Sequence, residues 1–172
     1  MKNKILIIIF VFISTLFLSC SSQLCLQKRT DRLIEKSQKE TDTVYLYSVA
    51  FNDFNLVWYH KNNFIHGFKV KPHNIEQYKL IEAKNIVLNN DSINKYFDNF
   101  LFKNIQCFES VLDGAWIKLY IKNKEPVLSN IDTECLFNTK FRPNSFPYKL
   151  QYDLFKLGRS PIDFNFEKMY LE

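Results

Sequence analysis

Hydrophobic and polar positions alternate in three consecutive runs, residues 43–51, 54–60 and 64–71. A period of two is typical of strands that bury one face and expose the other. Short polar segments, 52–53 and 61–63, separate the runs and suit tight turns. The pattern therefore predicts an antiparallel meander of three strands.

The turn between the first two runs sets their register. A two-residue turn at Asn52-Asp53 pairs Tyr47 with Trp58. The same register places Tyr45 opposite His60. We therefore expect these four side chains to share one face of the sheet.

The second turn admits two registers. A two-residue turn would bring Lys69 to the face of Trp58, whereas a three-residue loop over 61–63 would bring Phe68 there. A slip of one residue exchanges the two faces of a strand, so the face that is buried decides the register. We predict the three-residue loop because it collects apolar side chains on one face.

The predicted meander has one aromatic face and one mostly polar face. A candidate binding face lies on the aromatic side, and it consists of Tyr45, Tyr47, Trp58, His60 and His66. The two histidines would be diagonal neighbours about 7 to 8 Å apart. We expect Trp58 to be a core residue, and the histidines with Tyr45 to mark an edge that contacts a partner.

The chain after the meander predicts helices and a second hairpin. Asn74 and Gln77 resemble a capping box for a helix over 74–84, and a strand from Tyr78 is the alternative. Residues 93–101 have the apolar spacing of one helical stripe. These segments supply the helices expected to cover the sheet.

The best turn signal is Asp113-Gly114, which predicts a hairpin of 105–112 with 115–121. In this hairpin Glu109 faces Lys118 as a solvated ion pair, and a buried face collects Ala115, Ile117, Leu119 and Ile121. Farther on, 129–141 can hold a helical turn. The segment 148–157 fits either a helix that stops at Gly158 or a strand, and both remain open.

Residues 1–19 predict a signal peptide. Lys2 and Lys4 precede an apolar run over 5–18, and the small residue Ser19 ends it. The run is shorter than the roughly 20 residues that a helix needs to cross a bilayer. We therefore expect export without a permanent transmembrane helix.

The sequence Phe17-Leu18-Ser19-Cys20 resembles the lipobox of bacterial lipoproteins, although leucine usually stands at the position of Phe17. The resemblance covers residues 1–22 only. It implies that Cys20 becomes the acylated first residue, and that Ser21 directs the protein to the outer membrane. Several acyl chains give stable anchoring, whereas a single chain is marginal.

The chain thus divides into a signal peptide (1–19), a lipidated cysteine with a tether (20–41) and one domain (42–172). The segment 20–41 is polar and mixed in charge, and we expect coil with at most one helical turn at Leu33-Ile34. A coil of this length would hold the domain about 25 Å from the lipid.

Composition excludes several classes of function. The 23 basic and 18 acidic residues are interspersed, so the one-signed patch that nucleic acid requires is missing. Gly67, Gly114 and Gly158 lie too far apart for a phosphate-cradling loop of Walker or Rossmann type. His60 and His66 have no third ligand at zinc-site spacing. We predict no nucleic-acid partner, no metal and no cofactor.

With Cys20 lipidated, three cysteines remain: Cys25, Cys107 and Cys135. Only Cys107 and Cys135 both lie inside the predicted domain. The extracytoplasmic side permits a disulfide between them. In the chain-entropy model this disulfide would stabilise the fold by about 3 to 4 kcal/mol.

These patterns predict an α+β fold, an antiparallel sheet (meander plus a later hairpin) packed by one or two helices. The expected function is non-catalytic: a lipid-anchored envelope protein that binds or scaffolds an envelope protein or a small apolar ligand. One alternative is a small envelope hydrolase, in which Cys107 or Cys135 pairs with a histidine. Another is an immunity lipoprotein that blocks a toxin. An enzyme should show a deep pocket that collects His60 or His66 with a cysteine or a carboxylate.

Overall fold

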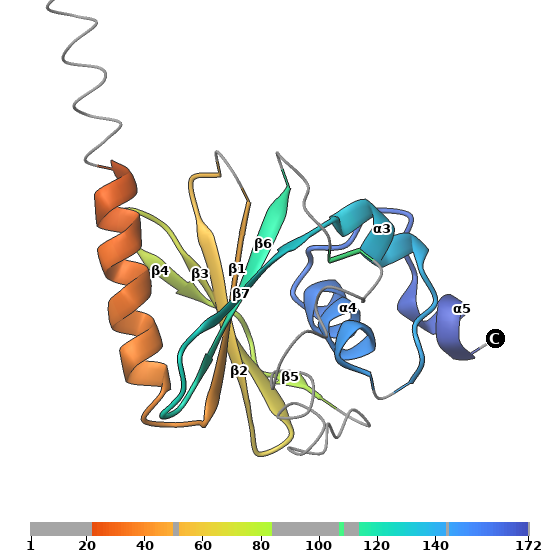
Figure 1. The fold of residues 1–172 in the computed structure, drawn as a ribbon, viewed down its shortest axis with the longest axis horizontal. Helices are drawn as coiled ribbons and strands as arrows, with labels where there is room; N and C mark the ends of the chain where they lie inside the picture. Colours follow the sequence, from red (N-terminus) through yellow and green to blue (C-terminus); the bar gives the residue numbers. More distant parts are fainter. Residues whose placement is uncertain (1–21, 50–51, 84–106, 109–113, 144, 172) are drawn as a thin grey trace, which may run out of the picture.

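An antiparallel sheet forms the centre of the structure, a computed structural model that describes residues 22–49, 52–83, 107–108, 114–143 and 145–171 (Figure 1). Among these residues the sheet has seven strands in the order β4-β3-β2-β1-β6-β7, and β5 also pairs with β3. The strands are β1 Thr43–Val49, β2 Asn55–Lys61, β3 Phe64–Val70, β4 Ile75–Gln77, β5 Ile81–Glu82, β6 Ala115–Ile121 and β7 Val127–Ile131. The predicted α+β class is confirmed.

The first hairpin has a different register from the predicted one. Tyr45 pairs with Trp58 and Tyr47 pairs with Leu56, a shift of two residues. The turn is longer than the predicted pair because β1 ends at Val49 and β2 begins only at Asn55. A shift of two residues preserves the faces of both strands, so Tyr45, Tyr47 and Trp58 still share one face.

The second hairpin has the two-residue turn, so the predicted three-residue loop is wrong. Asn62 and Asn63 have φ values of 52° and 63°, as a type I′ turn requires. Trp58 therefore pairs with Gly67, and His66 pairs with Tyr59 on the opposite face. The prediction failed because it assumed that only one face of the sheet is buried.

A helix over residues 22–37 covers the second face, where the sequence predicted a coil tether (Figure 1). Its buried positions follow a helical stripe: Leu26, Thr30, Leu33, Ile34 and Ser37. Two of these five residues are polar, which hides the stripe from a count of apolar positions. The helix is part of the domain, and it packs on the buried residues Val44, Leu46, Val57, Tyr59 and Val70.

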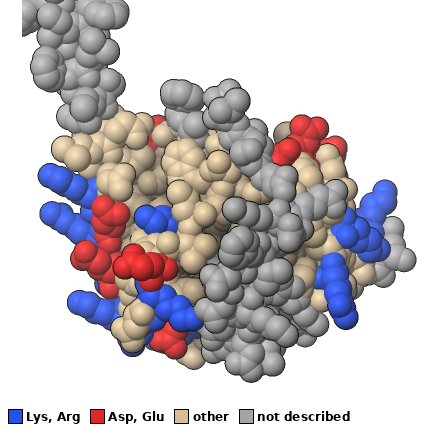
Figure 2. Space-filling view, in the orientation of Figure 1, with Lys and Arg blue, Asp and Glu red and all other residues tan. Residues whose placement is uncertain are grey.

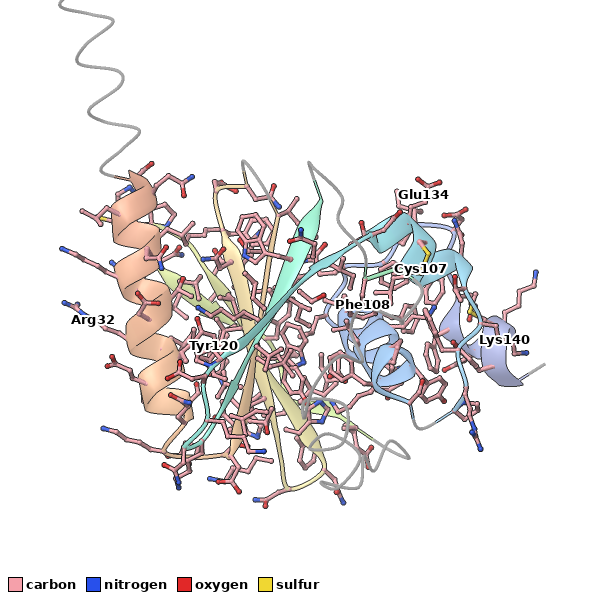
Figure 3. The ribbon with its side chains drawn as sticks, viewed as in Figure 1. Arg32, Cys107, Phe108, Tyr120, Glu134 and Lys140 are labelled. Atoms are coloured by element: carbon pink, nitrogen blue, oxygen red, sulfur yellow. A yellow bond between two sulfur atoms is a disulfide. The ribbon has the colours of Figure 1, made fainter. Side chains whose placement is uncertain are left out.

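The outer side of this N-terminal helix carries mixed charge. Figure 2 shows basic and acidic side chains interspersed over it. Arg32 lies on this outer side and points away from the sheet (Figure 3). The helix is therefore amphipathic, with its apolar side on the sheet and its charged side in solvent.

Three helices lie on the side of the first face: α3 Thr133–Asn138, α4 Phe146–Lys156 and α5 Phe166–Leu171 (Figure 1). Residues of α3 and α4 join the core of the sheet, and α5 packs on α4 through Phe166. Ser145 caps α4 because its side chain accepts a hydrogen bond from the backbone N–H of Tyr148. Gly158, with φ 68°, ends it. Residues 148–157, for which the sequence allowed either a helix or a strand, thus belong to a helix. The helical turn expected within 129–141 is α3.

Two other segments differ from the leading predictions. The segment 74–84 contains β4 and β5, so the strand alternative is right and the capped helix is wrong. Both edges of β6 are occupied, by β1 and by β7, so β6 does not form the predicted hairpin with 105–112. Glu109 and the helix expected over 93–101 lie outside the described residues. The predicted buried face of Ala115, Ile117, Leu119 and Ile121 is confirmed.

A disulfide joins Cys107 and Cys135, as the sequence predicted. It connects the short segment 107–108 to α3, and Phe108 packs into the core beside Phe146 of α4 (Figure 3). Cys25 is a free, exposed cysteine on the N-terminal helix.

The docking of the N-terminal helix predicts a large effect for Ile34→Ala. Ile34 is 3% exposed, so its truncation should lower the free energy of unfolding by about 2 to 5 kcal/mol. Arg32→Ala on the outer side of the same helix should change it by less than about 0.5 kcal/mol. Urea denaturation of both variants tests this, and equal stabilities would show that the helix is an undocked tether.

Candidate functional site

The candidate binding face is not assembled as the sequence predicted. Trp58 is fully buried, which confirms it as a core residue, but Tyr45 and Tyr47 are also buried and form no edge. His60 shares their face and is partly exposed. His66 lies on the opposite face, where its ring stacks on Tyr59 at 4.8 Å. The predicted pairing of the two histidines is therefore wrong.

In place of that face, the sheet and α4 assemble a buried polar group around Asp153. We call it the Asp153 cluster, and it consists of Tyr45, Trp58, His60, Lys149 and Asp153. One carboxylate oxygen, Oδ2, accepts hydrogen bonds from Trp58 Nε1 at 2.9 Å and from Lys149 Nζ at 2.7 Å. His60 Nε2 lies 2.8 Å from the same oxygen and also contacts Lys149 Nζ.

The local geometry of α4 explains why two charges enter the core together. Lys149 and Asp153 are four residues apart, so they lie on the same side of the helix, one turn from each other. This side faces the sheet, where Leu150 and Leu154 are also buried. The Tyr45 ring lies 5.0 Å from Lys149 Nζ and is stacked on Trp58. The ammonium group is therefore surrounded by a carboxylate, an imidazole and an aromatic ring.

Burial and charge oppose one another in the pKa values of the cluster. Burial by itself raises the pKa of Asp153, but Lys149 and His60 outweigh burial and hold this pKa at about 2. Burial lowers the pKa of Lys149, and the attraction of Asp153 counteracts part of this shift. Burial also raises the pKa of Tyr45. At neutral pH the Asp153 carboxylate is therefore ionised, and it interacts with both Lys149 and His60.

The Asp153 cluster has part of the chemistry of a catalytic site. An aspartate beside a histidine is the pair that orients and activates a nucleophile in a catalytic triad. In the described residues, however, the side-chain hydrogen bonds of His60, Lys149 and Asp153 bring no hydroxyl or thiol to the imidazole. The exposed fractions of these three side chains are 24%, 5% and 1%. Solvent reaches only the edge of the imidazole, so the arrangement acts chiefly as a brace between α4 and β2.

A groove lies on the opposite face of the sheet, between the N-terminal helix and the outer strands. The helix packs on β1, β2 and β3, and it leaves part of β6 and β7 uncovered. The groove has a volume of about 260 Å³. Its floor includes Trp116, Lys118, Tyr120 and Leu128, and its wall includes Gln23, Gln27 and Asp31. Tyr120 projects into the space between the sheet and the helix (Figure 3).

The sequence contained one signal for this groove. Trp116, Lys118 and Tyr120 alternate with the buried residues of β6, and this alternation placed Lys118 on the wetter face. The sequence did not reveal the wall of the groove, because the segment that forms it, residues 22–37, was interpreted as a tether. Two aromatic floor residues become a concave surface only when the helix packs beside them.

The described residues contain neither a cluster of metal ligands nor a helix that could span a membrane. They hold no group of three or more histidine, cysteine, aspartate or glutamate side chains that is placed to bind a metal ion. In the same part of the chain, no helix combines the length and the apolar character needed to cross a bilayer.

The brace predicts that Asp153→Asn is strongly destabilising. It leaves Lys149 buried without a counter-charge, which should lower the free energy of unfolding by about 3 to 5 kcal/mol. The matched control is Asp153→Asn combined with Lys149→Met, which removes both charges and should recover most of that loss. Chemical denaturation near pH 7 measures both variants. If the double variant is as unstable as the single one, the ion pair does not account for the loss.

Acid provides a second readout of the same ion pair. Asp153 has a folded-state pKa below its ordinary value near 3.8, so its contribution is complete above that value and is lost as the pH falls toward 2. The loss should be about 2 kcal/mol between pH 4 and pH 2. The double variant should lack this part of the acid sensitivity, and an identical pH dependence in both proteins would contradict the assignment.

Comparison with known proteins yields no relative: no family model, no curated protein and no solved structure matches this chain. A function has to be inferred from the residues and their contacts.

Proposed function

We propose that this protein is a lipoprotein of the bacterial cell envelope, anchored by acylated Cys20, whose domain binds an envelope protein and has no catalytic role. The signal peptide and the lipobox resemblance support the anchor. The Cys107–Cys135 disulfide is consistent with an oxidising compartment. Ser21 favours the outer membrane as the destination.

The N-terminal helix changes how the anchor would position the domain. Residue 22, two positions after the proposed lipid site, is already helical, and the helix is packed on the sheet. An acyl chain on Cys20 would therefore hold the domain close against the bilayer, without a flexible spacer of about 25 Å. The groove includes Gln23 and Gln27, three and seven residues after Cys20, so this part of it would lie close to the membrane.

The groove is the single observation that carries the binding proposal. Trp116 and Tyr120 are of the residue types that are enriched at the centres of protein interfaces. Polar side chains of the helix wall supply hydrogen-bonding groups around them. A surface of this mixed character suits a polypeptide better than a purely apolar ligand.

The edge of β7 suggests how a polypeptide would bind. In the described part of the chain β7 is the last strand of the sheet, so its outer edge offers backbone groups for another strand. Leu128 on β7 is 60% exposed and lies beside the groove. An extended segment of a partner would pair with β7 and place alternate side chains against Leu128 and Trp116.

Two observations weigh against the hydrolase alternative. Cys107 and Cys135, which that alternative requires as nucleophiles, are joined in the disulfide. The carboxylate beside His60 is buried and bound by three other groups of the Asp153 cluster. Both observations fit structural roles, which supports binding over catalysis.

The anchor predicts that Cys20→Ala abolishes acylation, because Ser19-Cys20 supplies the lipid attachment signal. The variant should incorporate no labelled palmitate and should leave the membrane fraction, while its domain remains folded. Cys25→Ala, five residues away, is the control and should be labelled like the wild type. Undiminished labelling of the Cys20 variant would refute the anchor.

The groove predicts that Trp116→Ala combined with Tyr120→Ala weakens partner binding by tenfold or more, since interface aromatics often contribute about 2 kcal/mol each. A photoreactive amino acid at Leu128 should crosslink one defined envelope protein in intact cells, and the double variant should lose that product. Ile162→Ala, at a fully exposed site away from the groove, is the control. An unchanged crosslink in a folded double variant would exclude the groove as the binding site.

A further inference from the structure

A second pocket, of about 290 Å³, lies on the other face of the sheet, beside the end of α4. It is lined by Lys69 of β3, by Glu76, Gln77 and Tyr78 from β4 and the residue after it, and by Arg159. Arg159 follows the glycine that ends α4, and its backbone N–H donates to the carbonyl of Leu154. Strand and helix termini thus fix the positions of both cationic residues.

The two cations converge on one aromatic ring. Lys69 Nζ lies 4.4 Å from the centroid of the Phe54 ring, and Arg159 Cζ lies 4.5 Å from the same centroid. Neither side chain forms an ion pair with a carboxylate in the described residues. The carboxylate that lines the pocket, that of Glu76, binds Lys71 Nζ at 2.6 Å. Lys69 and Arg159 therefore contact the same ring and line the same pocket, where Glu76 attracts Lys69 but forms its ion pair with Lys71.

Arg159 also carries an unused donor. Its Nε atom is buried, and within the described structure it has no hydrogen-bond partner. A buried donor without a partner costs about 1 to 3 kcal/mol, and more when the group is charged. An anionic ligand that accepts this hydrogen bond would remove the penalty and neutralise the neighbouring ammonium group.

We propose that this pocket binds a phosphate group, which Arg159 and Lys69 hold by charge-assisted hydrogen bonds. The planar guanidinium donates two parallel hydrogen bonds to phosphate oxygens, and a lysine ammonium acts as a compact second charge. Tyr78, which also lines the pocket, offers aromatic surface to the organic part of a phosphate ester. The site is separate from the groove, and it does not depend on the partner that the groove binds.

The phosphate group can come from a soluble phosphate ester or from a lipid headgroup. Phe54 and Lys69 lie near the end of the sheet where β2 begins and β3 ends. Arg29 of the N-terminal helix donates to the backbone carbonyl of Pro72, three residues beyond Lys69. Under the proposed anchoring at Cys20, this end faces the bilayer. This orientation rests on the proposed function, whereas the phosphate site itself rests only on the pocket.

The test uses the predicted mature chain, residues 20–172, with Cys20→Ala, so that neither an acyl chain nor the apolar signal peptide brings it to vesicles. The side-chain Nε–H signal of Arg159 is followed by NMR during titration with inorganic phosphate and with glycerol 3-phosphate. Sedimentation with phosphatidylcholine vesicles, with and without phosphatidylglycerol, forms the second arm. We expect a saturable shift of the Arg159 signal in the first arm, binding to the anionic vesicles in the second, or both.

Variants identify the pocket as the source of the signal. Lys69→Ala and Arg159→Ala should each weaken binding at least tenfold. The affinity of Arg159→Lys should lie between that of Arg159→Ala and that of the wild type. Lys156→Ala is the matched control, because Lys156 also stacks on aromatic rings but does not line the pocket. A response to soluble phosphate alone assigns a soluble ester, and a response that requires anionic vesicles assigns a lipid headgroup. No response in either arm, or a response that survives in Lys69→Ala and Arg159→Ala, would overturn the proposal.

Discussion

The buried carboxylate of Asp153 is the interaction on which the helical side of the fold depends. It is 1% exposed, and its oxygen Oδ2 joins α4 to β2 through Trp58 and His60 while it binds Lys149 of the same helix. An ionised group at this depth is tolerated only when its neighbours compensate for lost hydration. The sheet face beneath α4 is part of the hydrophobic core, and the contact of His60 with Asp153 helps to stabilise the buried charge there.

The N-terminal helix decides what the second face of the sheet becomes. By covering β1 to β3 it buries Val44, Val57 and Tyr59, and by stopping short of β7 it leaves a groove. Under the proposed anchoring at Cys20, the groove residues Gln23 and Gln27 follow the lipid site within seven residues, so the groove would open near the membrane.

Residues that are chemically conspicuous in the sequence did not form the site that they suggested. His60 and His66 were expected to be neighbours, but one residue of register in the β2–β3 hairpin separates them to opposite faces. Either register places apolar side chains on a buried face, because α4 covers one face of the sheet and the N-terminal helix covers the other. Local alternation of polar and apolar residues cannot choose between two buried faces. Trp58 and His60, two of the residues that bind Asp153, precede it by more than 90 residues, and no local pattern marks them as its partners.

The sequence by itself determined the α+β class, the strands of the meander, the buried face of β6 and the Cys107–Cys135 pair, because each follows from local periodicity or from the few cysteines present. It also carries the signal and lipobox resemblance that predict an anchor at Cys20. Only the tertiary structure decided the register of the hairpins, the helix over 22–37 and the assembly of the Asp153 cluster. The physical reason is that each of these depends on which surface covers another, and burial is a property of the packed chain as a whole.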